Sequence, residues 1–225
     1  MKVVAVIPCR NEARTVYNVV REALRYVDEV VVTDDNSTDD TAILARAAGA
    51  EVICNGSSLN GVGTNTKRGI SIVDADIVVT LDGDGQHLAS EIPNILTPIL
   101  KGVADLVIGS RFIGTYEAPR YRKSGNDVIA WMYNLGHKSR VVDSQSCFRA
   151  CTRRLLSKVS IEERGFGFST EVLIKARAQG FRIVEVPITC VYHKEFSWNS
   201  HMNPLKHGLS VVWSTIRWRL KEELL

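Results

Sequence analysis

The sequence lacks an apolar run that is long enough to cross a membrane. A spanning helix needs roughly 18 uncharged apolar residues, and no stretch of the 225 residues meets that requirement. Residues 1–12 also lack the long apolar core and the small-residue cleavage site of a signal peptide. We therefore expect a cytoplasmic protein without membrane spans.

The sequence also has little excess charge of either sign. Its formal net charge is +3, whereas nucleic-acid-binding domains gather basic residues into a stripe. We expect no nucleic-acid partner. The 45% hydrophobic content suits one domain with a buried core, with room for a C-terminal appendage.

Cysteine is sparse and does not form a metal-binding pattern. The five cysteines are an odd number scattered through apolar surroundings, which favours buried free thiols in a reducing compartment. Cys147 and Cys151 are the only close pair, and no second pair or histidine cluster completes a zinc site.

No glycine-rich, lysine-containing loop follows the first predicted strand. Residues 8–12 read Pro-Cys-Arg-Asn-Glu, whereas a nucleotidyltransferase on an α/β sheet is expected to carry a phosphate-binding loop there. The sequence therefore does not favour that class of enzyme.

Apolar strands alternate with amphipathic helices. The β-branched runs at 3–7, 29–33 and 77–81 are typical of strands buried on both faces, and helically spaced apolar residues separate them. We predict a mostly parallel, Rossmann-like α/β sheet flanked by helices. Further strands are predicted at 51–53, 105–109, 147–150, 182–186 and 188–192, and helices at 12–27, 37–48, 64–73, 90–101, 152–158, 169–179 and from Pro204 onward.

Residues 112–126 are rich in Gly, Pro, Tyr and Arg, so we expect a long mobile loop, followed by a helix that ends at Gly136.

Polar clusters follow the predicted strands. In open α/β sheets, ligands bind beyond the carboxyl ends of the strands, so these clusters are expected to form one site. They are residues 8–12, 34–37, 82–86 and 110–111.

Asp82-Gly83-Asp84 is the strongest of these clusters. Two carboxylates in one turn can bind Mg²⁺ or Mn²⁺, which also bind diphosphate oxygens, and Gly83 allows close approach of the backbone. Gln86 and His87 are within reach as further ligands. The alternative is a solvated acidic turn, but its position directly after a buried strand favours a site.

The other clusters allow two interpretations. Asp34 and Asp35 could accept hydrogen bonds from a base or ribose, while Ser37 or Asp39 caps the next helix. Asn60-Gly61-Val62-Gly63 could support a nucleotide or form a plain turn, and Lys67 could be solvated. Arg149 could equally belong to a structural ion pair.

Arg111 could bind phosphate with both guanidinium prongs. The basic residues Arg120, Arg122 and Lys123 of the following segment could close on anions or be solvated.

Together these residues resemble the family 2 glycosyltransferases of GT-A fold, in the polyprenyl-phosphate branch typified by dolichol-phosphate mannose synthase. The matching motifs run in order from residue 6 to about residue 190. They are Pro8-x-x-Asn11-Glu12, Asp34-Asp35-x-Ser37-x-Asp39-x-Thr41, Asn60-x-x-Gly63, residues 82–87, residues 105–112, Pro119-x-x-Arg122-x-x-Gly125-Asn126, Asp143-x-x-Ser146-x-Phe148-Arg149 and Gly165-Phe166-x-Phe168-x-x-Glu171.

The resemblance implies a role for each matching position. Asp82, Asp84 and Gln86 would hold Mg²⁺ or Mn²⁺, and Arg122 and Asn126 would meet the acceptor phosphate. The catalytic residues would be Asp84, Arg111 and Arg122. The nucleotide-sugar contacts would be Pro8, Arg10, Glu12, Asp35, Lys67, Asp82, Gly83, Asp84, Arg111, His193 and Lys194.

The chain departs from the family near its C-terminal end. Relatives usually place an Arg and then a Ser-Lys pair after the strand predicted to end near Tyr192, where this chain has His193 and then Ser197-Trp198. Lys194 or a protonated His193 could replace that second phosphate clamp. Cys147 stands where relatives carry a small residue.

The implied reaction is an inverting transfer of mannose or glucose from GDP-mannose or UDP-glucose to a polyprenyl phosphate. A phosphate acceptor has a second pKa near ~6 and is largely ionised at pH 7, so it needs orientation more than a general base. The alternatives are a family 2 transferase acting on a soluble or glycan hydroxyl, and a non-catalytic nucleotide-sugar-binding subunit.

We divide the chain into a catalytic domain at 1–200 and an amphipathic helix at 201–225. Trp213, Trp218 and several basic residues on that helix suit a membrane interface, and packing on the domain or on a partner is the alternative. We expect a peripheral protein on the cytoplasmic face of a membrane, held by the lipid surface or by a membrane subunit.

Overall fold

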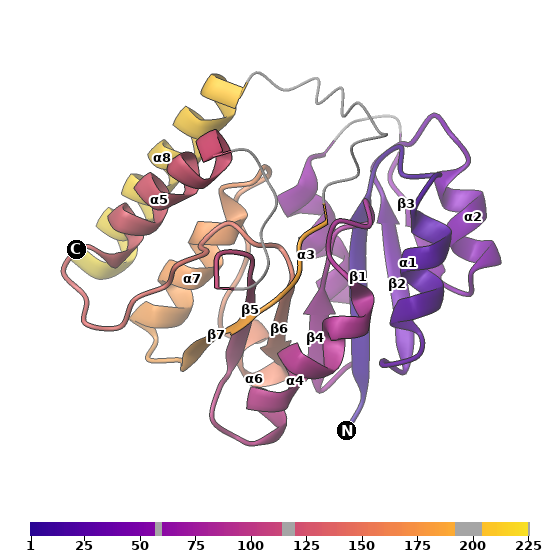
Figure 1. Ribbon diagram of the computed structural model, residues 1–225, viewed down its shortest axis with the longest axis horizontal. Helices are drawn as coiled ribbons and strands as arrows, with labels where there is room; N and C mark the ends of the chain where they lie inside the picture. The colour runs from indigo at the N-terminus through magenta and orange to yellow at the C-terminus, as the bar shows by residue number, and fades with distance from the viewer. Residues whose placement is uncertain (57–59, 114–119, 192–203, 225) are drawn as a thin grey trace.

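The computed structural model describes residues 1–56, 60–113, 120–191 and 204–224, with the side chains of 120–122, 204–207 and 223–224 left out. One sheet runs through the described chain (Figure 1). Its strands are β1 (Val3–Cys9), β2 (Glu29–Asp34), β3 (Glu51–Cys54), β4 (Ile77–Thr80), β5 (Leu106–Ser110), β6 (Arg149–Thr152) and β7 (Ile183–Pro187).

The helices connect and cover these strands. A 3₁₀ turn at Ala89–Glu91 precedes α4, and a π-helical turn at Leu220–Leu224 follows α8. The α-helices are α1 (Val16–Ala23), α2 (Thr41–Ala47), α3 (Val62–Ile72), α4 (Ile92–Leu100), α5 (Arg120–Asn134), α6 (Arg153–Leu156), α7 (Phe168–Ala178) and α8 (Pro204–Arg219).

The strand order is β3-β2-β1-β4-β6-β5-β7. All pairings are parallel except those of β6, which lies antiparallel between β4 and β5. The mostly parallel α/β prediction is confirmed. The strand predicted at 147–150 instead covers Arg149–Thr152, because its ladder begins where Arg149 pairs with Thr80 and Ile108.

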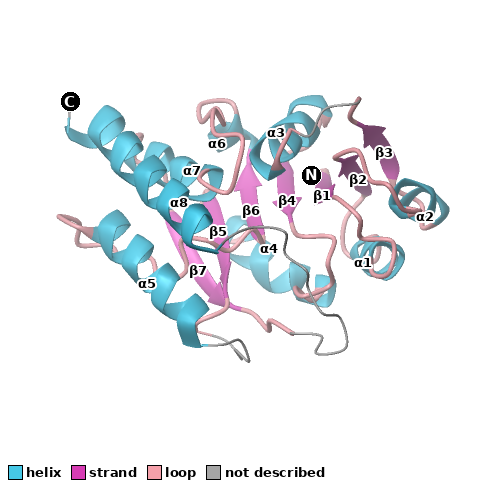
Figure 2. Ribbon diagram, turned by 90° about the horizontal axis from the view of Figure 1, so that it is seen from above, coloured by secondary structure: helices cyan, strands magenta, loops and turns pink. Residues whose placement is uncertain are grey.

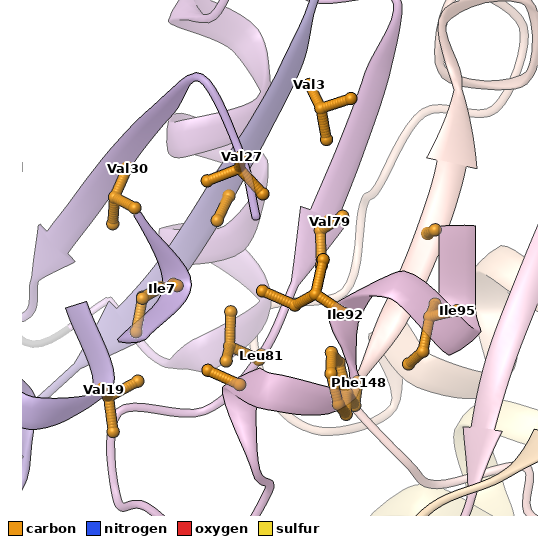
Figure 3. Packing of buried hydrophobic residues seen from close by; sticks show 14 of the residues in the cluster. Val3, Ile7, Val19, Val27, Val30, Val79, Leu81, Ile92, Ile95 and Phe148 are labelled. Atoms are coloured by element: carbon orange, nitrogen blue, oxygen red, sulfur yellow. The ribbon is translucent and has the colours of Figure 1, made fainter. Parts of the chain in front are cut away.

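Helices lie on both faces of the sheet, as the view from above shows (Figure 2). On one face, Ala5 and Ile7 of β1 belong to a core with residues of α1, α2 and α4. Figure 3 shows part of this core, with Ile92 and Ile95 of α4 beside Phe148 and Val79. The other face carries α3, α6 and α7. The apolar strand runs are therefore explained by burial on two sides.

Two sequence predictions are wrong in the second half of the chain. Residues 120–126 were assigned to a loop but belong to α5, whose helical spacing is hidden by its Gly and basic residues. No strand occupies residues 188–191; only an isolated bridge joins Cys190 to His87. Tyr192 lies outside the described residues.

The last helix packs against the domain. Its Val211 and Trp218 are buried, and α8 contacts α5 and α7. No helix in the described part of the chain is long and apolar enough to span a bilayer. The division at residue 200 stays a prediction. Four of the cysteines are buried free thiols, whereas Cys54 is exposed.

Candidate active site at the carboxyl edge of the sheet

Hydrogen bonds join the loop after β1 to the loop after β2. The backbone N–H of Asn11 donates to Ser37 Oγ at 2.9 Å, and that of Glu12 donates to Thr41 Oγ1 at 2.7 Å. Asn11 adopts φ 57°, and its Oδ1 accepts from the Thr38 N–H at 2.8 Å. The loop that follows β1 is thereby fixed with Glu12 at the carboxyl edge of the sheet.

The acidic pair after β2 has two separate tasks. Asp34 accepts the N–H and the hydroxyl of Ser37, which closes a turn. Asp35 is buried and accepts the backbone N–H groups of Asn60 and Gly61 at 2.9 and 3.0 Å. Asp35 therefore shapes the approach to α3. Its Oδ1 also accepts the Asn55 side-chain amide at 3.2 Å, so the carboxylate is already engaged by several groups of the protein.

The Asp82-Gly83-Asp84 turn follows β4 and is packed against β1. A Cβ on Gly83 would lie 2.4 Å from Cys9 Sγ, so a larger residue here would require Cys9 to shift. The Thr15 hydroxyl donates to Gly83 O at 2.7 Å, and Asp84 Oδ1 accepts the Gln86 N–H at 2.9 Å. The sequence predicts that Gly83 lets the backbone come close to a ligand. Its packing against Cys9 is a second reason for a glycine at this position.

Negative charge accumulates around this turn. Burial, followed by the charges of Asp84 and Asp82, raises the pKa of Glu12 to about 8. Burial and the neighbouring Asp84 raise the pKa of Asp82 to about 7. Carboxylates that resist ionisation in each other's presence are stabilised by a cation.

Nearby side chains offset that charge only in part, because the charge of Arg111 lowers the pKa of Asp82 by less than burial and Asp84 raise it. His87 Nδ1 lies 3.7 Å from Asp82 Oδ2, yet burial and the charge of Arg111 lower the pKa of His87 to about 3, so the ring is neutral. Nδ1 is buried and has no hydrogen-bond partner in the described part of the chain. His87 stacks on Phe148 at 5.6 Å between ring centroids.

The chemistry of these residues fits a hard divalent cation. Within the described ranges, no three acidic, histidine or cysteine side chains converge into a preformed metal site. Mg²⁺ commonly uses one or two carboxylates and completes its shell with water and substrate phosphate oxygens. Asp82 and Asp84 have the chemistry for that role, and they and the Gln86 side chain stay predicted ligands.

Arg111 lies past the end of β5 and is held by Asp143. Nε lies 2.7 Å from Oδ2 and Nη2 lies 2.8 Å from Oδ1, and the Arg111 N–H also donates to Oδ2 at 3.0 Å. Burial alone raises the pKa of Asp143, but the hydrogen bonds and charge of Arg111 hold it below its ordinary value. The pair fixes the guanidinium at the edge of the sheet.

The Asp143 turn is itself held from two sides. Glu185 on β7 accepts the N–H groups of Val142 and Asp143 at 2.7 and 2.8 Å. Asn126 on α5 donates from Nδ2 to Val142 O at 2.8 Å. Asn126 is buried and connects α5 to the turn that holds Arg111.

The other predicted contacts have the following positions. Arg10 and Lys67 are exposed. The backbone of Arg122 is in the first turns of α5, with its side chain outside the described set, and His193 and Lys194 lie outside the described residues. Pro8 is in β1 opposite Thr33.

Within the described residues, Arg149 bonds to backbone carbonyl groups and forms no ion pair. Its buried guanidinium donates to the carbonyl oxygens of Ser144, Ser146 and Ser169 at 2.7 to 2.9 Å.

The sequence did not reveal the role of Glu171 on α7. Its buried carboxylate accepts the N–H groups of Glu162 and Glu163 at 2.7 and 2.9 Å, and pairs with Lys175. The adjacent Arg164 O accepts the Gly63 N–H at 2.8 Å, at the start of α3. Glu171 thus supports the segment against which α3 begins.

The glycines at 60–63 are explained by that contact. A Cβ on Gly63 would lie 2.2 Å from Glu163 O, and one on Gly61 would lie 2.7 Å from Arg164 O. Gly61 also has φ +83°. Close backbone packing therefore requires both glycines.

Comparison with known proteins gives one family. Residues 4–165 match "Glycosyl transferase family 2". Glycosyltransferase AglJ of Haloferax volcanii is 31% identical over 208 residues, which cover 89% of this chain and 66% of AglJ, just under two thirds of its length. The dolichyl-phosphate hexose transferase of the same organism is 30% identical over 217 residues, covering 95% of this chain and 92% of that protein.

A solved structure shares the fold. Glucosyl-3-phosphoglycerate synthase from Mycobacterium tuberculosis, in complex with Mn²⁺, UDP and phosphoglyceric acid, matches with a TM-score of 0.76. It is 24% identical, and the match covers 98% of this chain and 78% of that one.

Proposed function

The chain belongs to glycosyltransferase family 2, and we propose that it transfers a hexose from a nucleotide sugar to a polyprenyl phosphate. The dolichyl-phosphate hexose transferase, which matches over nearly its whole length, supports this acceptor class. The donor we propose is GDP-mannose or UDP-glucose.

We assign the donor diphosphate and its cation to the acidic turn. Asp82 and Asp84, with Gln86, would bind Mg²⁺ or Mn²⁺, and the related fold that holds Mn²⁺ and UDP supports this assignment. The cation would neutralise charge on the departing diphosphate. Glu12, whose pKa is raised by the same carboxylates, would ionise more readily once the cation is bound.

Arg111 would contact the diphosphate from the side opposite the cation. Asp143 holds its guanidinium in one orientation before the donor binds, so little reorganisation is needed as negative charge develops. Asp35 would accept hydrogen bonds from the base or the ribose of the donor. We also propose donor contacts from Pro8, Arg10, Lys67 and Gly83, and from His193 and Lys194.

The acceptor phosphate would be oriented at the start of α5. Arg122 would contact it, and Asn126 would support that site by holding Val142. A phosphate with a second pKa near ~6 is already a nucleophile at pH 7, so inversion at the anomeric carbon requires no general base from the chain.

One observation carries this proposal: Glu12, Asp82 and Asp84 are close enough at the carboxyl edge of the sheet that burial and their mutual charges raise the pKa values of Glu12 and Asp82 to about 8 and about 7, although Arg111 acts in the opposite direction on Asp82. The test is incubation with Mn²⁺, radiolabelled GDP-mannose or UDP-glucose, and a short-chain polyprenyl phosphate. We expect label to enter the organic phase with the wild type and not with Asp84→Asn. The matched control is Asp74→Asn, at a side chain that is 95% exposed.

Other results would favour other functions. Label that is transferred but stays in the aqueous phase would indicate a soluble acceptor. Donor binding without turnover on any acceptor would indicate a binding subunit.

A further inference from the structure

Two neighbouring helices each expose a row of large apolar side chains. On α5, Val128, Trp131 and Leu135 are 53%, 63% and 54% exposed. On α8 and the turn that follows it, four more have helical spacing. They are Leu209, Trp213, Ile216 and Leu220, of which Leu209 and Trp213 are each 68% exposed. We call these seven residues the two-helix face.

The two helices lie side by side along one end of the molecule in both views (Figures 1 and 2). Arg219 on α8 donates to the carbonyl oxygens of Met132 and Leu135 on α5 at 2.5 and 2.6 Å. The opposite side of α8 is fixed to the domain through the buried Trp218, whose Nε1 donates to Glu163 at 2.9 Å. The two-helix face is therefore exposed, while the opposite side of α8 is anchored to the domain.

This gathering differs from the other exposed apolar side chains. Ile43 on α2, Ile72 on α3 and Val103 after α4 lie on separate elements, and isolated exposures of that kind are ordinary. A gathering of exposed large apolar side chains on adjacent helices, here with two tryptophans, is typical of an interaction surface. Tryptophan is favoured where one side of its environment is apolar and the other is wet.

The charge around the two-helix face indicates which kind of partner binds there. The two segments that carry it, 123–140 and 208–222, hold basic side chains in excess of acidic ones, although the whole chain has a net charge of only +3. Arg217 and Lys221 lie 4.0 and 3.5 Å from Glu163 and Glu162, but half-exposed pairs at such distances are weak. The basic residues are Lys123, Lys138, Arg140, Arg217, Arg219 and Lys221, against Asp127, Glu222 and, directly after the second segment, Glu223.

We propose that the two-helix face rests on a bilayer surface that contains anionic lipid headgroups. This inference rests on the proposed function, because a polyprenyl-phosphate acceptor resides in a bilayer. An apolar strip with tryptophan and flanking basic residues is the combination that binds such an interface. A second copy of this basic surface would repel the first, which favours lipid over self-association.

The face is also connected to the candidate site. Asn126, two residues before Val128, bonds to the Val142 carbonyl, and the next residue, Asp143, holds Arg111. Docking on α5 and α8 would therefore place the start of α5 near the headgroups, where a lipid phosphate is presented.

The test uses the purified full chain and no sugar donor, so it is independent of catalysis. Co-sedimentation is measured with vesicles of phosphatidylcholine alone and of phosphatidylcholine with phosphatidylglycerol. We expect stronger binding to the anionic vesicles, and a loss of about tenfold or more in Trp131→Ser/Trp213→Ser. The matched control, Ile43→Ser/Val103→Ser, removes two other exposed apolar side chains and should bind like the wild type.

Three outcomes would overturn the inference. They are no vesicle binding by the wild type, equal binding by the tryptophan variant, and a wild-type dimer in solution that the tryptophan substitutions dissociate. Transfer to a water-soluble short-chain acceptor, measured on the same variants, keeps a failure of docking distinct from a failure of the proposed reaction.

Discussion

Arg111 and Asp143 form a two-pronged ion pair at the carboxyl edge of the sheet, with Nε 2.7 Å from Oδ2 and Nη2 2.8 Å from Oδ1. Asp143 is fully buried, and its turn is held in place by Glu185 and Asn126. The guanidinium is thereby fixed before any ligand binds.

Asp143→Asn should therefore lower both activity and stability. The amide cannot accept both prongs, and removing one partner of a buried pair costs about 3–5 kcal/mol. We expect kcat to fall by about 100-fold as Arg111 loses its orientation. Urea unfolding and steady-state kinetics test this. Asp127→Asn, which breaks the half-exposed pair with Lys123, should change neither by much.

Gly83→Ala should weaken cation binding through a steric clash with Cys9. The new Cβ would lie 2.4 Å from Cys9 Sγ, and overpacking of this kind costs about 1–3 kcal/mol. Cys9→Ala removes the obstructing sulfur, so Gly83→Ala/Cys9→Ala should recover Mn²⁺ affinity. A double variant as defective as Gly83→Ala alone would show that the clash is not the cause.

The metal-free protein should lose stability as the pH rises from about 6.5 to about 8. The folded-state pKa values of Glu12 and Asp82, about 8 and about 7, lie above their unfolded values near ~4. The folded state thus binds more protons, and its stability decreases with pH. His87, whose folded-state pKa is lowered to about 3, has the opposite effect, but only below its unfolded value near ~6.5.

Thermal or urea unfolding at several pH values measures this trend. Glu12→Gln should flatten the decrease of stability with pH. Mn²⁺ at 100 times its Kd should stabilise the folded protein by about 2.7 kcal/mol, and it should reverse the direction of the pH dependence. A pH-independent stability between 6.5 and 8 in the metal-free protein would contradict the prediction.

Glu171→Gln should raise the KM for the donor and destabilise the fold by about 3 kcal/mol or more. Its buried carboxylate holds the N–H groups of Glu162 and Glu163 and pairs with Lys175. Glu162→Gln is the matched control, because Glu162 pairs with the same lysine from a half-exposed position. Equal effects of the two substitutions would rule out a supporting role for Glu171.

The position of the acidic turn could be read from the sequence. The apolar run before Asp82 is long enough for a buried strand, and the rule that ligands bind beyond strand ends then places Glu12, Asp82 and Arg111 on one edge. The structure brings these residues together. Local pattern and topology were sufficient because each residue lies within three positions of the end of its strand.

The hydrogen-bond partners of the site residues could not be predicted from the sequence in the same way. Asp143 is 32 residues from Arg111, and periodicity does not indicate which loop reaches which strand end. The antiparallel direction of β6 depends on a long connection through α5, and a short apolar run does not show its own direction. Asp35 was assigned to a ligand, and its bonds to Asn60 and Gly61 depend on how the approach to α3 folds back.

Titration of the protein with Mn²⁺ in the presence of GDP or UDP tests the central claim most directly. Wild-type protein should bind one Mn²⁺ per chain more tightly with the diphosphate than without it, and Asp82→Asn and Asp84→Asn should each abolish that binding, whereas Asp74→Asn should not. Undiminished Mn²⁺ binding by the Asp82 and Asp84 variants would contradict the account.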